Sequence, residues 1–81
     1  MKAILTKYLG PTNFRGSRIK AYDEDNNSII ISWNHAWNVD QNHCYAASQL
    51  IKKMNWNCII IGSGSIKTGY AHIMCDIKEK T

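Results

Sequence analysis

One helical segment with both ends marked sets the main constraint on how this chain folds. Asn38 and Gln41 form a variant capping box, because Asn38 can accept from the amide three residues on and Gln41 can reach back. An aspartate follows in the first turn and two lysines lie in the last, as the helix dipole favours. The spacing predicts a helix from about Val39 to Met54. We expect its apolar stripe to bury Cys44, Ala47, Leu50, Ile51 and Met54, which makes Cys44 a core thiol.

Five segments have the composition of strands, three before the helix and two after it. They are residues 2–9, 18–23, 28–33, 57–61 and 70–77. Residues 24–27 are rich in Asn and Asp and predict a turn, which makes a hairpin of the second and third segments. Residues 57–61 are apolar enough to predict a central strand. Gly62–Ser65 is predicted to be the turn after it, and Lys67–Gly69 can widen that turn. The β-β-β-α-β-β order predicts an α+β fold: a two-layer domain with one antiparallel sheet and the helix on one face.

The size of the chain limits it to one domain, spanning residues 1–81. Hydrophobic residues make up 44% and charged residues 20%, which is typical of a globular protein rather than a disordered one. Every apolar run is far shorter than the ~20 residues that a membrane span needs. Lys2 and Lys7 interrupt the first segment, which argues against a signal peptide. We therefore expect a cytoplasmic protein with no membrane partner.

The cysteines and histidines do not form a recognisable chemical motif. Cys44, Cys58 and Cys75 are odd in number and lack a repeated spacing, so we expect reduced thiols rather than a disulfide framework or a zinc site. His72 and Cys75 lie three apart on a predicted strand and point to opposite faces. His43 and Cys44 are adjacent on the helix and diverge. We expect no catalytic set, no metal and no cofactor, with the acid, base and nucleophile candidates scattered on opposed faces.

The connection between the first two predicted strands is a candidate binding surface. A two-residue turn is enough to join such strands, yet Gly10–Ser17 uses about eight residues. Phe14, Arg15 and Arg18 supply an aromatic ring and two guanidinium groups there. Arginine binds carboxylate or phosphate through two hydrogen bonds, and the ring fills a pocket or stacks on a base. The alternative interpretation is a plain strand connection with solvated arginines.

The charge and the tryptophans extend this candidate surface. Positive charge is concentrated in the first quarter of a chain whose net charge is +4, which suits an acidic protein surface or nucleic acid. Trp33 and Trp56 are predicted to pack in the core, whereas Trp37 precedes the helix cap and suits the rim of an interface. The full set of predicted partner-binding residues is Phe14, Arg15, Arg18, Lys20, His35 and Trp37.

Several short motifs carry a resemblance to a known group of proteins, and Gly10–Ala21 is the most specific part of it. The motifs are residues 2–4, 6–13, 15–21, 35–36, 38, 42–43, 46–47, 53–54 and 56. In these positions the chain resembles a family of short uncharacterised proteins found in phages, prophages and other mobile elements. It departs from that family at Trp33-Asn34, where the family has Tyr-Asp, and at Gly62–Gly64, where the family has a run of glycines.

The resemblance implies a biological context rather than a chemistry. Small proteins of mobile elements often bind and inhibit host defence complexes, as anti-CRISPR proteins do, or they modulate nucleic-acid transactions. We therefore expect a non-enzymatic phage-type protein that inhibits a host defence or DNA-processing complex by protein–protein interaction. The alternative is a small basic nucleic-acid-binding protein that uses the first hairpin and its loop. The sequence also leaves a homodimer open.

Overall fold

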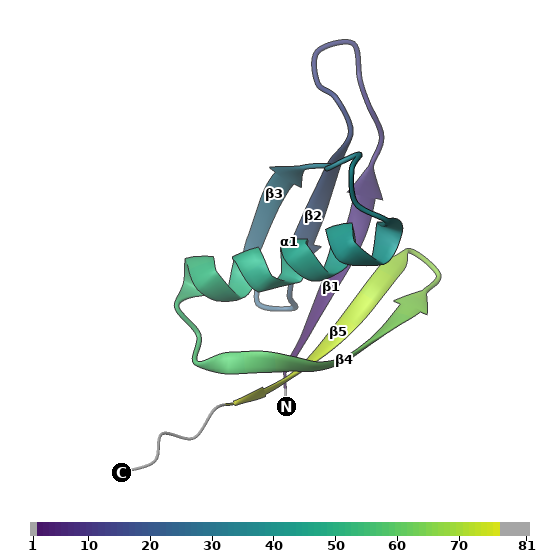
Figure 1. The fold of residues 1–81 in the computed structure, drawn as a ribbon. Coiled ribbons are helices and arrows are strands. Elements are labelled where there is room, and N and C mark those ends of the chain that lie inside the picture. The colour runs from purple at the N-terminus through teal and green to yellow at the C-terminus, as the bar shows by residue number, and fades with distance from the viewer. Residues whose placement is uncertain (1, 77–81) are drawn as a thin grey trace.

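The strands and the helix occur in the predicted order. A computed structural model of the protein describes the backbone of residues 2–76 and the side chains of residues 3–74. The elements are β1 (Lys2–Leu9), β2 (Arg18–Tyr22), β3 (Ser28–Ser32), α1 (Val39–Met54), β4 (Cys58–Ile66) and β5 (Gly69–Asp76). Figure 1 shows α1 lying across one face of a single sheet, which confirms the α+β prediction. The strand end predicted at Ile77 and the side chain of Cys75 lie outside the described residues.

The helix begins and ends where its capping signals predict. The Gln41 amide donates to Oδ1 of Asn38 at 2.8 Å, and the Asn38 amide donates to Oε1 of Gln41 at 3.0 Å, so both halves of the capping box are present. Asn55 ends the helix in the left-handed conformation, with φ of 56°. Within residues 2–76, α1 is too short and too polar to cross a membrane.

The sheet is antiparallel throughout, and its strand order is β3-β2-β1-β5-β4. β1 is therefore the central strand, and β4 lies at an edge. The prediction that residues 57–61 form a central strand is wrong. Their apolar run does not reflect burial on two faces, because Ile59 is 53% exposed and Ile61 is 54% exposed, while Cys58 and Ile60 are half-buried beneath the helix layer.

The turn predicted at Gly62–Ser65 is also wrong, because these residues belong to β4. The chain reverses instead at Lys67 and Thr68, and Ile66 pairs with Gly69. A β-bulge between Ile60 and Gly62 shifts the register on the way. Glycine and serine are typical of turns, yet here pairing with β5 keeps them extended, so tertiary contacts override the local preference.

The core lies between α1 and the sheet. Fully buried apolar side chains come from the sheet (Ile4, Ile19, Ala21, Met74) and from the helix (Ala46, Ala47, Leu50). Trp33 and Trp56 are half-buried and pack against this core, as predicted.

The prediction that Cys44 is a core thiol is wrong, because Cys44 is exposed and His43 is buried. The buried face of α1 contains His43, Ala46, Ala47 and Leu50. Cys44 is rotated by about 100° around the helix axis from His43, so it points away from this face. The exposed Cys44 is a free thiol.

Gly69 provides a direct test of how closely β5 approaches β1. Its φ is +156°, and a Cβ at this position would collide with the backbone carbonyl of Thr6 on β1. We expect Gly69→Ala to lower the free energy of unfolding by about 1–3 kcal/mol, because the clash involves backbone that cannot move aside. Thermal melts would show a drop of several degrees.

Gly64→Ala is the matched control, since a Cβ at Gly64 meets nothing within 4 Å. We expect its stability to stay within about 0.5 kcal/mol of the original protein or to rise slightly. Equal melting temperatures for Gly69→Ala and the original protein would contradict the described approach of β5 to β1.

Candidate functional site

Three connections and the start of the helix gather at one end of the sheet, which we call the loop end. They are the β1–β2 loop (residues 10–17), the β3–α1 loop (residues 33–38), the β4–β5 turn (residues 67–68) and the first turn of α1. The antiparallel pairing requires this arrangement, because β1 and β3 end where β2 and β5 begin. The β1–β2 loop extends farthest from the sheet (Figure 1).

The β1–β2 loop is held by its own hydrogen bonds. The hydroxyl of Thr12 accepts from the amides of Phe14 and Arg15 at 3.2 and 3.0 Å, and the Thr12 amide donates to the Arg15 carbonyl at 2.7 Å. At the base of the loop, the Tyr8 hydroxyl and Ser17 Oγ lie 2.8 Å apart. This bonding fixes a turn at the tip, so the loop has a defined shape before any partner binds.

The tip of the loop presents Phe14 and Arg15 to solvent. Phe14 is 95% exposed, the highest exposure of any large apolar side chain in the described residues. Arg15 is also exposed. The predicted placement of these two residues on an accessible loop is confirmed.

Arg18 and Lys20 lie on β2, on the sheet face opposite α1. Lys20 is paired directly with Lys7 of β1, and their ammonium groups lie 5.5 and 5.6 Å from the centre of the Tyr22 ring. We call Lys7, Arg18, Lys20 and Tyr22 the basic patch. Arg18 is half-buried, so its side chain is less accessible to a partner than that of Arg15. Its buried Nε has no hydrogen-bond partner among the described residues. Sequence reasoning missed Lys7 and Tyr22, because only the strand register brings them beside Lys20.

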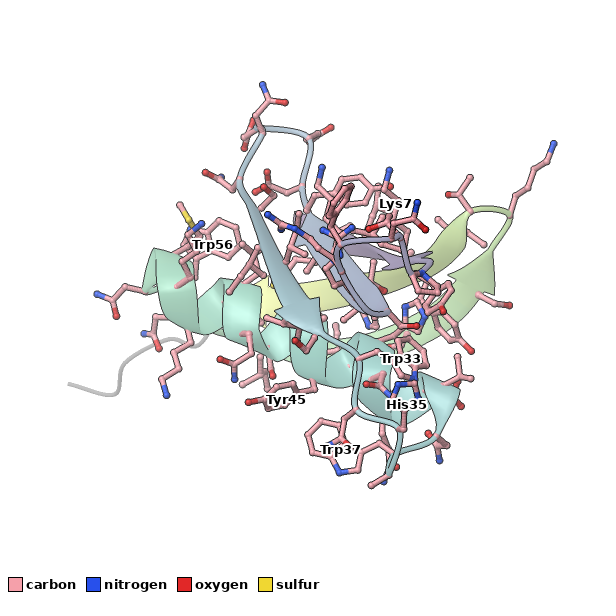
Figure 2. The ribbon with its side chains drawn as sticks, turned by 90° about the horizontal axis from the view of Figure 1, so that it is seen from above. Lys7, Trp33, His35, Trp37, Tyr45 and Trp56 are labelled. Carbon is pink, nitrogen blue, oxygen red and sulfur yellow. The ribbon has the colours of Figure 1, made fainter. Side chains whose placement is uncertain are left out.

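His35 and Trp37 lie on the β3–α1 loop, on the helix side of the sheet and away from Lys7 (Figure 2). His35 is exposed, and Trp37 is 37% exposed. The Trp37 ring meets Tyr45 edge-on at 4.9 Å, and the two line a shallow groove of about 380 Å³ together with Gln41 and Cys44. The six predicted residues therefore occupy three places: the loop tip, the basic patch and the β3–α1 loop.

Asn42 holds the β3–α1 loop in place. Its carbonyl oxygen accepts from the Asn34 amide at 2.8 Å, and its amide nitrogen donates to the carbonyls of Asn34 and Asn38, both at 3.0 Å. The side chain is buried, and these bonds compensate for its desolvation. An asparagine within an apolar helical stripe is the sequence signal that could have indicated this role.

A buried polar network joins the first half of α1 to the sheet. Thr6 Oγ1 lies 2.7 Å from Nδ1 of His43 and 3.0 Å from Nε2 of His72. Nδ1 of His72 lies 2.8 Å from Oγ of Ser63. We call these four residues the histidine network. The prediction that base and nucleophile candidates are scattered on opposed faces is wrong for His43, His72 and Ser63, because pairing of β4 with β5 turns Ser63 toward the helix layer.

The histidine network is satisfied by two opposite arrangements of protons. Thr6 carries one hydroxyl proton, so it donates to one imidazole and accepts from the other. When Thr6 donates to His43, His72 donates to Thr6 and accepts from Ser63. When His43 donates to Thr6, every bond reverses and both rings stay neutral. The two arrangements differ in the direction of the hydrogen bonds, and neither places a charge in the interior.

Burial lowers the pKa of both histidines below the ordinary value of 6.5. For His43, desolvation lowers the pKa by more than the nearby carboxylate of Asp40 raises it. For His72, desolvation is joined by the proximity of His43, because two imidazolium charges would repel each other. Both rings are therefore neutral at neutral pH, which matches the proton arrangements described above.

A series of aromatic contacts connects the histidine network to the loop end. Tyr8 meets Trp33 at 5.1 Å, Trp33 meets His43 at 5.9 Å, and His43 lies against Tyr70 at 4.2 Å between ring centres. The Tyr70 hydroxyl donates to Asp40 at 2.6 Å, and this hydrogen bond is the main reason why the pKa of Tyr70 is raised above 10.0. Tyr8 and Trp33 of this series lie at the bases of the β1–β2 loop and the β3–α1 loop, so the aromatic contacts link both loops to the histidine network.

The described side chains contain no group of three or more His, Cys, Asp or Glu that could hold a metal ion. Searches against protein-family models, curated proteins and solved structures found no match to this chain.

The lowered histidine pKa values predict how stability depends on pH. Below about pH 6.5 the unfolded chain takes up protons at these two positions, while the folded protein resists doing so. We therefore expect the free energy of unfolding to fall as the pH is lowered from about 7 to about 5. Denaturant titrations at fixed pH values would measure this fall.

His35→Gln is the matched control for this prediction. The side chain of His35 is exposed, so its replacement leaves the histidine network intact, and the fall in stability should persist. A free energy of unfolding that stays constant over this pH range would contradict the burial of neutral His43 and His72.

Proposed function

We propose that this protein is a non-enzymatic binding protein that docks the tip of its β1–β2 loop, Phe14 and Arg15, onto a partner protein. The observation that carries the proposal is the exposure of Phe14, at 95%, on a loop that is held by its own hydrogen bonds. A phenylalanine at the end of a loop contributes nothing to the core of the fold. An apolar ring held in this position is suited to a partner's pocket.

The fixed shape of the loop supports this interpretation. Ordering a flexible segment on binding costs about 0.5–1.5 kcal/mol for each immobilised side chain, and backbone ordering adds to this. The hydrogen bonds of Thr12, and the one between Tyr8 and Ser17, already order the loop in the free protein, so less ordering remains to be done on binding. The resulting tip combines an aromatic anchor with an arginine, two of the residue types that dominate binding energy at protein interfaces.

Charge defines the kind of partner. Arg15 lies at the tip of the loop, Arg18 follows its base, and Lys7 and Lys20 lie on the open face of the sheet. Such a surface attracts an acidic protein and accelerates its association. We propose a partner that has an apolar pocket beside carboxylate groups.

The resemblance of Gly10–Ala21 to phage and mobile-element proteins suggests the identity of that partner. We propose a host defence complex or a DNA-processing complex, blocked inside the host cell in the manner of an anti-CRISPR protein. The segment that carries the resemblance most specifically is also the segment that forms the exposed loop and the first part of the basic patch.

A double variant at the loop tip tests this function. We expect Phe14→Ala with Arg15→Ala to abolish inhibition, because truncation of each anchor costs about 2 kcal/mol or more and the loss of both lowers the affinity roughly a thousandfold. The free energy of unfolding should change by no more than about 0.5 kcal/mol, since both side chains are exposed. The measurement is phage or plasmid challenge of strains that carry defined defence systems, together with a thermal melt.

The matched control is Ile59→Ala with Lys52→Ala, which removes an exposed apolar side chain on edge strand β4 and an exposed cation in the last turn of α1, outside both the loop and the basic patch. This control should inhibit as the original protein does. A loop-tip variant that inhibits equally well would show that the working surface lies elsewhere. An original protein that alters no challenge outcome would contradict the inhibitory role.

The basic patch supports a second candidate function, which is direct binding of single-stranded nucleic acid. Lys7 and Lys20 flank the Tyr22 ring on an open antiparallel sheet face. Bases stack on such rings, while cations contact the phosphates. The patch is small, and this ranks the function second.

Salt dependence distinguishes this second function from protein binding. Phosphate contacts by Lys7, Arg18 and Lys20 predict a slope of about −2 to −3 in a plot of log affinity against log salt concentration. Lys7→Ala with Lys20→Ala should make that slope less steep by roughly 1.5. Gel-shift titrations measure it, and the absence of a shift at low salt would rule the function out.

A further inference from the structure

The sheet carries a helix on only one of its two faces. Thr6 and His72 point toward α1, and side chains alternate along a strand, so Leu5 and Ala71 point to the other face, which we call the open face. Among residues 2–76, α1 is the one helix, and it lies on the opposite side of the sheet (Figure 1). Apolar side chains on the open face, such as Ile73, therefore remain exposed. An exposed apolar surface of this kind is typical of a binding site.

The apolar part of the open face contains a groove over β4 and β5. Gly62 and Gly64 have no side chains, and together with Ala71 and Ile73 they line a space of about 410 Å³. A Cβ at either glycine meets nothing within 4 Å, so no part of the described chain fills the space above them. The groove can therefore receive apolar side chains of a partner.

The strand register places cations beside this groove. Leu5 of β1 pairs with Ala71 at the groove and with Tyr22 on its other side. Lys7 and Lys20 are paired two residues farther along the same face, and their ammonium groups lie 5.6 and 5.5 Å from the centre of the Tyr22 ring. The open face is thus apolar over β4 and β5 and positively charged over β1 and β2.

We propose that the open face binds an acidic amphipathic α-helix of a partner protein, with the apolar stripe of that helix in the groove and its acidic flank over the basic patch. The groove lies over β4 and β5, and Lys7 lies on β1, so the strand spacing separates them by roughly 7 Å across the sheet. A helix with its side chains is about 10–12 Å wide and covers both. This site needs neither Phe14 nor Arg15, so it is additional to the loop tip.

The dimensions of the open face match a helix that lies along the strands. β5 has eight residues, Gly69–Asp76, and such a strand spans about 26 Å, the length of a helix of roughly 18 residues. Arg18 precedes Lys20 by two residues on β2, which is about 7 Å along the strand. Two acidic residues four positions apart on a helix are separated by about 6 Å along its axis. They can therefore meet Lys20 and Arg18 in turn.

The apolar half of the open face favours such a helix over single-stranded nucleic acid. Bases bind by stacking on aromatic rings. Among the described strand residues that point to this face, Tyr22 is the one aromatic residue. The groove is lined by glycine, serine, alanine and isoleucine, which offer neither rings nor cations to a nucleic acid. A helix that carries both leucine and glutamate complements the two halves of the surface.

Two synthetic peptides test the charge part of the proposal. The acidic peptide has about 18 residues, with leucines on one stripe and glutamates on its flanks, and the basic peptide has lysine in place of each glutamate. We expect the original protein to bind the acidic peptide at least roughly tenfold more tightly than the basic one, as measured by isothermal titration calorimetry. Binding of neither peptide, or of both equally, overturns the proposal.

Charge reversal on the basic patch tests which cations select the peptide. Lys7→Glu with Lys20→Glu should reverse the preference, so that the basic peptide binds more tightly. Arg15→Glu with Lys52→Glu is the matched control, because it changes the net charge equally at two exposed residues away from the open face. The control should keep the preference for the acidic peptide. Equal behaviour of the two double variants overturns the proposal, since it places the selection outside the basic patch.

Two leucine substitutions locate the apolar part of the site. Gly64→Leu fills the groove, and the free protein has open space for this side chain. Ser65→Leu makes the same addition at the next residue, which is exposed and pairs with Tyr70 on the helix side of the sheet. We expect Gly64→Leu to weaken binding of the acidic peptide at least roughly tenfold and Ser65→Leu to leave it unchanged, with a cooperative thermal transition in both. Equal affinities of the two variants overturn the proposal.

An oligothymidylate is the third probe, because the second candidate function uses the same cations. Binding of the acidic peptide but not of the oligonucleotide supports the proposal. Binding of the oligonucleotide but not of the peptide overturns it and favours nucleic-acid binding by the basic patch. The peptide assay involves neither a host complex nor the loop tip, so its failure is distinct from a failure of the loop-tip function.

Discussion

The hydroxyl of Thr6 is the contact on which the packing of this small protein depends. It lies on the central strand and bonds one histidine from the helix and one from β5, so three elements meet at one oxygen atom. Loss of that hydroxyl would leave two buried ring nitrogens unpaired, at about 1–3 kcal/mol each. A domain of this size has roughly 4–12 kcal/mol of stability in total. The helix therefore sits on the sheet through a polar contact as well as through Ile4, Ile19 and Leu50.

This interior contact is connected to the surface that we propose to bind. His43 lies against the aromatic series that ends at Tyr8, and Tyr8 bonds Ser17 at the base of the β1–β2 loop. The Trp33 amide donates to the Ser17 carbonyl at 3.0 Å, which joins the β3–α1 loop to the same point. The tip can therefore expose Phe14 without being a loose segment, because its base belongs to the packed structure. Rigid support of an exposed anchor is what fast, specific recognition requires.

Local signals predicted the parts of this fold that depend on neighbouring residues. The helix runs from Val39 to Met54 as expected, since a capping box and a C-terminal asparagine act within a few residues. The edge position of β4 and the extended Gly62–Ser65 depend on pairing with β5, which no local pattern contains. The histidine network joins Thr6 to residues 37 and 66 positions away, so it was out of reach of sequence periodicity. For the candidate site, composition indicated Phe14 and Arg15, whereas the bonds that shape the tip came from the structure.

The central claim is that the β1–β2 loop is already ordered in the free protein. The most direct measurement is the set of backbone ¹⁵N relaxation order parameters for the amides of Thr12, Phe14 and Arg15, compared with those of β1 and β2 in the same sample. The account predicts values near 0.85, the same as in the strands. Values below about 0.6 at the tip, with rigid strands beside it, would contradict a preformed binding loop.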